Sequence, residues 1–71
     1  MSIAKNIRAL REAKGFTQRE LGSIMRVDST YISSLECGRV NPGLEMIQNL
    51  SDALDCTPND LFGIAREKAA V

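Results

Sequence analysis

The stretch that most constrains the fold of this chain is residues 17–36, TQRELGSIMRVDSTYISSLE. Its hydrophobic residues recur at helical spacing on both sides of a short break, which predicts two short helices joined by a tight turn. Thr17 begins a capping box with Glu20, and Asp28 can cap the second helix. The hydrophobic side chains predicted to share one inward face are Leu21, Ile24, Met25, Val27, Ile32 and Leu35.

Small polar side chains occupy the outer side of the second predicted helix. Ser29, Thr30, Ser33 and Ser34 point outward together when the hydrophobic residues point inward. Two helices arranged in this way form a helix-turn-helix, whose second helix lies in the major groove of DNA. The sequence therefore predicts a small DNA-binding regulator.

The rest of the chain is predicted to be helical as well. A first helix over about residues 2–14 is followed by Gly15, and Thr57 begins a last helix with a second capping box. No stretch alternates as a strand would, and 71 residues suffice for one domain only. We expect an all-α domain of five helices spanning residues 1–71. The hydrophobic stripe of its fourth helix is Leu44, Ile47, Leu50 and Leu54.

The charges are divided unevenly along a chain whose net charge is zero. Residues 1–39 hold seven basic and four acidic groups, for +3, and residues 40–71 hold two basic and five acidic groups, for −3. A neutral protein polarised in this way can present one face to phosphates and another to a partner. A split of this size in a short chain also arises by chance, and that interpretation stays open.

Several classes of function do not fit the composition. The chain has no histidine, the usual general base and metal ligand, and no phosphate-binding glycine loop, so we expect no enzyme, cofactor, metal or small-molecule ligand. No hydrophobic run exceeds three residues, which argues against a membrane span. Cys37 and Cys56 are too few for a disulfide scaffold, so we expect a cytoplasmic protein with inert, packed thiols. Redox sensing through Cys37 is the alternative.

The sequence resembles the Cro/CI-type (XRE) helix-turn-helix family of bacterial and phage regulators over about residues 3–62. The runs that carry the resemblance are IRALREAKGFTQRELG, VDSTYISSLECGRVNP and LEMIQNLSDALDCTPNDLF. It implies a compact, λ-repressor-like domain that binds double-stranded operator DNA. The segment DSTYIS also resembles the restriction–modification controller proteins, a small dimeric branch of the family. Further residues in register are Arg11, Gly15, Phe16, Thr17, Gln18, Glu36, Gly38 and Pro42.

The resemblance assigns base readout to the start of the second motif helix. The matching positions are Ser29, Thr30, Ser33 and Ser34, with Tyr31 near the DNA backbone or a thymine methyl group. A hydroxyl both donates and accepts a hydrogen bond, so it discriminates bases weakly. We therefore expect sequence-dependent DNA shape to carry more of the specificity. The alternative is that these residues are merely solvated.

The resemblance assigns phosphate contacts to two segments that flank the motif. Gln18, at the start of the first motif helix, is expected to contact a phosphate. It is also expected to brace the second motif helix, which is the recognition helix that enters the major groove. Arg39 and Asn41 follow the second motif helix and are expected to contact the same strand. Thr17 and Arg19 are weaker candidates, and Arg19 is equally well explained as a solvated charge.

Other positions bear on stability. By resemblance, Arg11 and Glu36 form a structural ion pair between the first and third helices. Arg26 stands where the family has glycine, and a left-handed conformation there costs about 1 kcal/mol. Gly22 replaces alanine at a similar cost in helix propensity, and Gly43 replaces a capping serine. These departures indicate a domain of modest stability that a dimer completes.

The last part of the chain is expected to form the partner contact. Leu61, Phe62 and Ile64, within a dimerisation region over residues 54–71, fit a two-fold interface between copies. Such a homodimer binds a near-palindromic operator. The alternative is an antitoxin or another protein-interaction module, for which DNA binding is secondary and the same surface binds a different protein.

Overall fold

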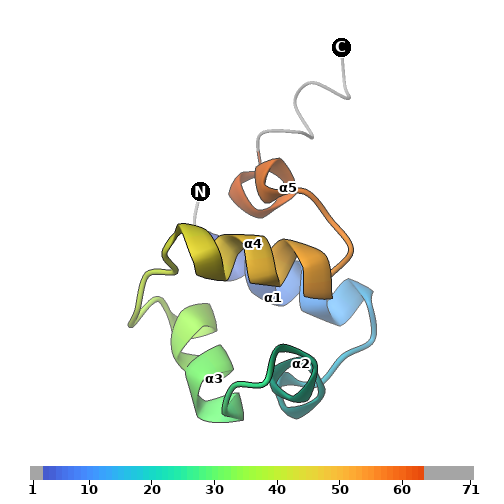
Figure 1. The fold of residues 1–71 in the computed structure, drawn as a ribbon, viewed down its shortest axis with the longest axis vertical. Coiled ribbons are helices and arrows are strands. Elements are labelled where there is room, and N and C mark those ends of the chain that lie inside the picture. Colours follow the sequence, from blue (N-terminus) through green and yellow to red (C-terminus); the bar gives the residue numbers. More distant parts are fainter. Residues whose placement is uncertain (1–2, 64–71) are drawn as a thin grey trace.

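Five α-helices and no strand make up residues 3–63, the part of the chain that the computed structural model describes. Figure 1 shows α1 and α4 crossing the middle of the domain, one behind the other, with α2 and α3 at one end and α5 at the other. The predicted all-α, five-helix fold is confirmed. The helices are α1 (Ile3–Ala13), α2 (Gln18–Met25), α3 (Ser29–Cys37), α4 (Leu44–Ala53) and α5 (Pro58–Phe62).

Local capping signals in the sequence define the two helices of the motif. The Thr17 hydroxyl accepts a hydrogen bond from the Glu20 backbone N–H at 3.0 Å, and Glu20 Oε1 accepts one from the Thr17 N–H at 2.8 Å. At the start of α3, Asp28 Oδ1 accepts a hydrogen bond from the Thr30 N–H at 3.1 Å. Gly38 ends α3 in a left-handed conformation with φ 79°. The predicted capping box and caps are therefore confirmed.

A single hydrophobic core holds all five helices together. Its buried members come from every helix, so the motif is anchored by the same side chains that join α1 to α4 and α5. No helix within residues 3–63 has the length and hydrophobicity needed to cross a membrane. The core residues are Ile7, Leu21, Ile32, Leu35, Ile47, Leu50, Leu54 and Leu61.

Two residues predicted to point inward lie at the surface. Ile24 is 49% exposed, because Leu21 and Gly22 are both buried and the inward face of α2 is centred between them. At 100° per residue, Ile24 then points about 110° away from that centre. Leu44 is 88% exposed, because it is the first residue of α4 and the buried stripe begins only one turn later, at Ile47.

The predicted interface at the end of the chain also needs correction. Leu61 is fully buried in the domain's own core and is not available to a partner. Its carbonyl accepts a hydrogen bond from Asn6 Nδ2 at 2.7 Å, which ties α5 to α1. Because α5 has five residues only, the one hydrophobic side chain that it turns inward is needed to cover α1. Phe62 is 44% exposed, and Ile64 lies outside the described residues.

A buried ion pair joins α1 to α3. Arg11 Nε lies 2.6 Å from Glu36 Oε2, and Arg11 Nη2 donates to Glu36 Oε1 at 3.1 Å. Arg11 Nη1 donates to the Phe16 carbonyl at 2.7 Å, so this guanidinium also holds the loop that leads into α2. The hydrogen bonds to Glu36 raise the pKa of Arg11 above its ordinary value, against the opposing effect of burial. The Glu36 side chain is 3% exposed, so both charges are largely removed from water.

We expect Glu36→Gln to lower the free energy of unfolding by roughly 3–5 kcal/mol, because the buried Arg11 charge then lacks its carboxylate. The measurement is urea unfolding followed by circular dichroism. Asp55→Asn is the matched control, since Asp55 pairs with Lys14 at 3.7 Å on the exposed surface, where such pairs contribute less than about 1 kcal/mol. Equal losses for the two variants would show that the buried pair does not constrain the domain.

Candidate nucleic-acid interface

The outer side of α3 carries a continuous row of small polar side chains. Ile32 and Leu35 anchor the helix in the core with almost no exposed surface. The side chains on the opposite side of the helix are then directed to solvent, with Thr30 fully on the outside and the serines on its flanks. The sequence-predicted readout residues that share this side are Ser29, Thr30, Ser33 and Ser34, of which Thr30 is exposed and the others are half-buried.

Hydroxyl groups limit what this row can recognise. Each hydroxyl donates one hydrogen bond and accepts others, so it suits several base edges. A side chain of this length also lacks the paired donors with which arginine distinguishes guanine. The row therefore allows the helix backbone to approach a groove closely, but each contact discriminates weakly between bases.

Tyr31 has a different role from its hydroxyl-bearing neighbours. Its ring is half-buried and packs against the hydrophobic core. Packing of the ring restricts the rotation of α3 about its own axis, because the ring and Ile32 contact the core on adjacent sides of the helix. The exposed part of Tyr31 remains available at the edge of the row.

The start of α2 is held against the end of α3 by Gln18. Gln18 Nε2 donates a hydrogen bond to Glu36 Oε1 at 3.1 Å, so the side chain joins the buried ion pair of Arg11 and Glu36. The first backbone N–H groups of α2 point away from the helix body, where the positive helix end attracts anions. The Thr17 hydroxyl accepts the capping hydrogen bond and keeps its own hydrogen to donate.

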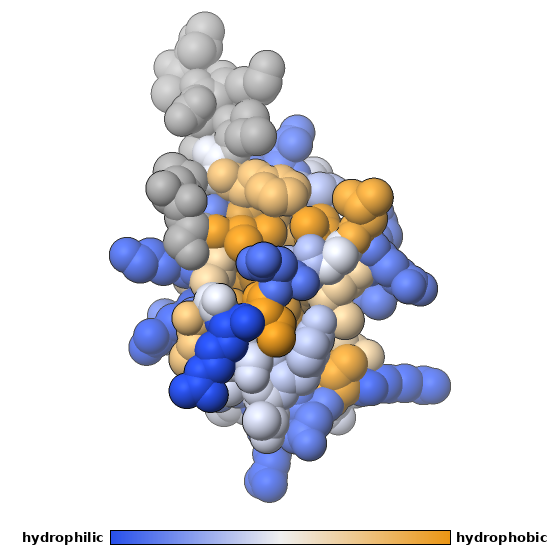
Figure 2. Space-filling model, turned by 90° about the vertical axis from the view of Figure 1, so that its left-hand side faces the viewer, coloured by the Kyte–Doolittle hydropathy of each residue, from blue (hydrophilic) through white to orange (hydrophobic). Residues whose placement is uncertain are grey.

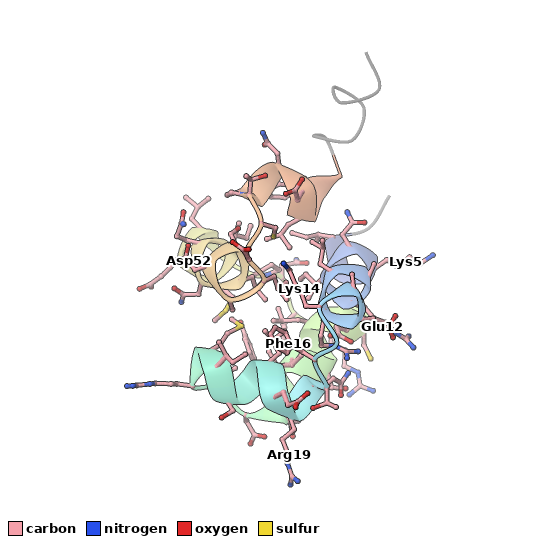
Figure 3. The ribbon with its side chains drawn as sticks, turned by 90° about the vertical axis from the view of Figure 1, so that its right-hand side faces the viewer. Lys5, Glu12, Lys14, Phe16, Arg19 and Asp52 are labelled. Carbon is pink, nitrogen blue, oxygen red and sulfur yellow. The ribbon has the colours of Figure 1, made fainter. Side chains whose placement is uncertain are left out.

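Basic and amide side chains surround the polar row. Figure 3 shows Arg19 extending from the start of α2 away from the body of the domain. Arg39 and Asn41 are exposed in the connection between α3 and α4, and the Arg39 backbone N–H donates to the Ser34 carbonyl at 3.0 Å. That hydrogen bond keeps the start of the connection beside the recognition helix. The structure thus brings the phosphate candidates of α2 and of this connection beside the same end of α3, where Gln18 contacts Glu36 and Arg39 contacts Ser34.

The expectation of a packed thiol holds for Cys56 and is wrong for Cys37. Cys37 is exposed at the end of α3, so it is not a packing residue. It lies seven residues after Thr30, two helical turns along the same side, a spacing that would have placed it in the outward row. Cys56 is half-buried, and burial followed by the nearby Asp60 charge raises the pKa of its thiol, which keeps it protonated and unreactive.

Comparison with known proteins agrees with this geometry. Residues 7–61 match the helix-turn-helix family. The HTH-type transcriptional regulator DdrOP3 of Deinococcus deserti is 33% identical over 62 residues, which cover 87% of this chain and 48% of that protein. This chain therefore spans about half the length of that relative.

Solved structures of similar proteins also indicate the helix-turn-helix family. The restriction–modification controller protein C.AhdI from Aeromonas hydrophila is 37% identical, with a TM-score of 0.80 over 84% of this chain and 91% of that one. The P22 c2 repressor, solved in complex with a synthetic operator, is 31% identical, with a TM-score of 0.81 over 90% and 97% of the two chains. The predicted Cro/CI-type family is thereby confirmed, and the chain belongs to the helix-turn-helix family of DNA-binding transcriptional regulators, which are not enzymes.

Proposed function

We propose that this protein binds a near-palindromic DNA operator as a dimer and regulates transcription by occupying a promoter. The observation that carries the proposal is the polar row of α3 together with the phosphate candidates beside its end, Gln18, Arg39 and Asn41. This arrangement presents a helix to the major groove with phosphate-binding groups beside it. The operator complex of the similar P22 c2 repressor supports the assignment.

Side-chain chemistry separates the residues proposed to bind phosphate from those proposed to read bases. Arg39 carries a full charge on a short segment held beside α3, so it suits a phosphate on any sequence. Thr30 lies at the centre of the row and has only a hydroxyl and a methyl group, so it suits a base edge. Affinity then comes mainly from the phosphate contacts of Gln18, Arg39 and Asn41, and sequence preference comes from the polar row of α3 together with DNA shape.

A second exposed surface supports dimerisation. Figure 2 shows hydrophobic side chains interrupted by charges on the side of the domain that carries the connection between α3 and α4. The exposed hydrophobic residues that we assign to this dimer surface are Val40, Leu44 and Phe62. A two-fold contact here buries the 88% exposed Leu44 and places two recognition helices on one side of the DNA. Operator half-sites are then spaced by one helical turn, about 34–36 Å.

A pool of random DNA duplexes, titrated with the protein at two salt concentrations and sequenced after retention, tests the function. We expect enrichment of a near-palindrome whose half-sites are one helical turn apart. Weak binding that falls steeply with salt and enriches no sequence would contradict the proposal. That outcome would favour the protein-interaction module as the function.

The assignment of readout and positioning is tested by two substitutions. Thr30→Ala should reduce the preference for the operator over random DNA by roughly three- to tenfold, the effect of one hydrogen bond. Arg39→Ala should weaken binding to both DNAs alike and lower the slope of log K against log salt by about 1. Lys5→Ala is the control, since Lys5 projects from α1 (Figure 3). Identical effects of the first two substitutions would contradict the assignment.

The dimer surface is tested by Leu44→Glu. We expect the variant to sediment as a monomer, because a two-fold contact would bury two carboxylates, and to bind the operator at least tenfold more weakly. The monomer should keep the helical content of the wild type in circular dichroism, because Leu44 is exposed and an acidic residue suits the first turn of a helix. Ile24→Glu, on a half-exposed residue of α2, is the control. Unchanged self-association of Leu44→Glu would place the interface elsewhere.

A further inference from the structure

The turn between α2 and α3 has an unusual backbone geometry. It reverses at Arg26, which has a left-handed conformation with φ 61° and ψ 41°. Two glycines end other helices of this chain in a different part of the left-handed region, Gly38 at φ 79° and ψ 14° and Gly63 at φ 80° and ψ 8°. A residue with a Cβ atom is confined near φ 57° and ψ 47°, whereas glycine is not. The Cβ atom of Arg26 thus restricts the direction in which the chain leaves α2.

The chain leaves Arg26 in close contact with α2. The Val27 N–H donates to the Gly22 carbonyl at 2.8 Å. A Cβ atom on Gly22 would lie 2.7 Å from the Val27 carbonyl oxygen and 3.3 Å from the Ser29 nitrogen. Both are backbone atoms, so they have no side-chain rotation by which to move away. The sequence suggests that Gly22 merely weakens α2, but the structure shows that it makes room for the start of α3.

We propose that Arg26 and Gly22 form a coupled pair that positions the recognition helix for base readout. The left-handed backbone at Arg26 directs the chain so that the Val27 carbonyl lies against α2. Gly22 has no side chain and therefore leaves room for this carbonyl. A glycine at position 26 relaxes toward the geometry of Gly38 and Gly63, moving this carbonyl and reducing the need for a glycine at position 22.

A displacement of the start of α3 by a few tenths of an ångström is enough to affect its proposed contacts with DNA. Ser29 and Thr30 begin α3 directly after the contact with Gly22. Hydrogen bonds between a hydroxyl and a base form within about 2.5–3.2 Å, so a small displacement of the helix start loses them. This part of the inference rests on the proposed operator binding, whereas the coupling of the two residues does not.

The coupling is measured by a double-mutant cycle in thermal unfolding. We expect Gly22→Ala to lower Tm by on the order of 10 °C, because the overpacked contact is with backbone. In the Arg26→Gly background the same substitution should lower Tm by less than half as much, or raise it through better helix propensity. Ser23→Ala is the matched control, since Ser23 is the exposed neighbour of Gly22 on α2.

The positioning role is measured at a temperature at which every variant is folded. Gly22→Ala should reduce the ratio of operator affinity to random-DNA affinity by roughly tenfold, the effect of about one mismatched base pair. The double variant Gly22→Ala, Arg26→Gly should recover the ratio to within about threefold of wild type. Ser23→Ala should leave it unchanged. A residue with a structural role alone changes Tm and leaves this ratio as it is.

Three results would overturn the inference. Tm changes that add without coupling, or a double variant that is no more folded than Gly22→Ala, would show that the two residues act independently. An unchanged affinity ratio in folded Gly22→Ala would show that the pair does not position α3 for readout. If wild type selects no operator, the proposed function fails instead, and the thermal cycle still decides whether the residues are coupled.

Discussion

The buried cluster of Arg11, Glu36 and Gln18 is the interaction on which the arrangement of the other helices depends. It joins α1, α2 and α3 through one carboxylate that accepts three hydrogen bonds, at 2.6, 3.1 and 3.1 Å. Hydrophobic packing alone tolerates small rotations of a helix, whereas a largely buried charge tolerates no loss of its partner. The recognition helix is therefore held at its end by charge and at its middle by the core.

The rigid placement of α3 compensates for the weak base discrimination expected of the hydroxyls in its polar row. The hydroxyls of α3 carry no charge and cannot form the paired contacts of arginine, so in the proposed operator complex the placement of the helix contributes more to selectivity than any single side chain does. The turn at Arg26 and the contact at Gly22 set the start of α3, so they affect the same placement. The charge split seen in the sequence contributes less than expected, since Lys14 of the basic half lies 3.7 Å from Asp55 of the acidic half.

The starts of helices could be predicted from the sequence, whereas the direction of several hydrophobic side chains and of Cys37 could not. The capping residues Thr17, Asp28 and Thr57 predicted where helices begin, because a cap acts within three residues of itself. The inward or outward direction of Ile24, Leu44 and Cys37 was predicted wrongly. Each lies near the end of a helix, where the direction of a side chain depends on which neighbouring helix covers that end. Leu61 was misplaced for the same reason, since α5 is too short to have a face without its contact to α1.

The sequence by itself determined the number of helices, their limits, the outward polar row of α3 and the family. These follow from hydrophobic periodicity, caps and short motifs, which act between residues close in the chain. Only the tertiary structure decided that Gln18 joins the buried ion pair, that Leu44 is exposed and Leu61 is not, and that Gly22 makes room for α3. Those features depend on distances between backbone segments that the packed core brings together, and no spacing along a single helix encodes such distances.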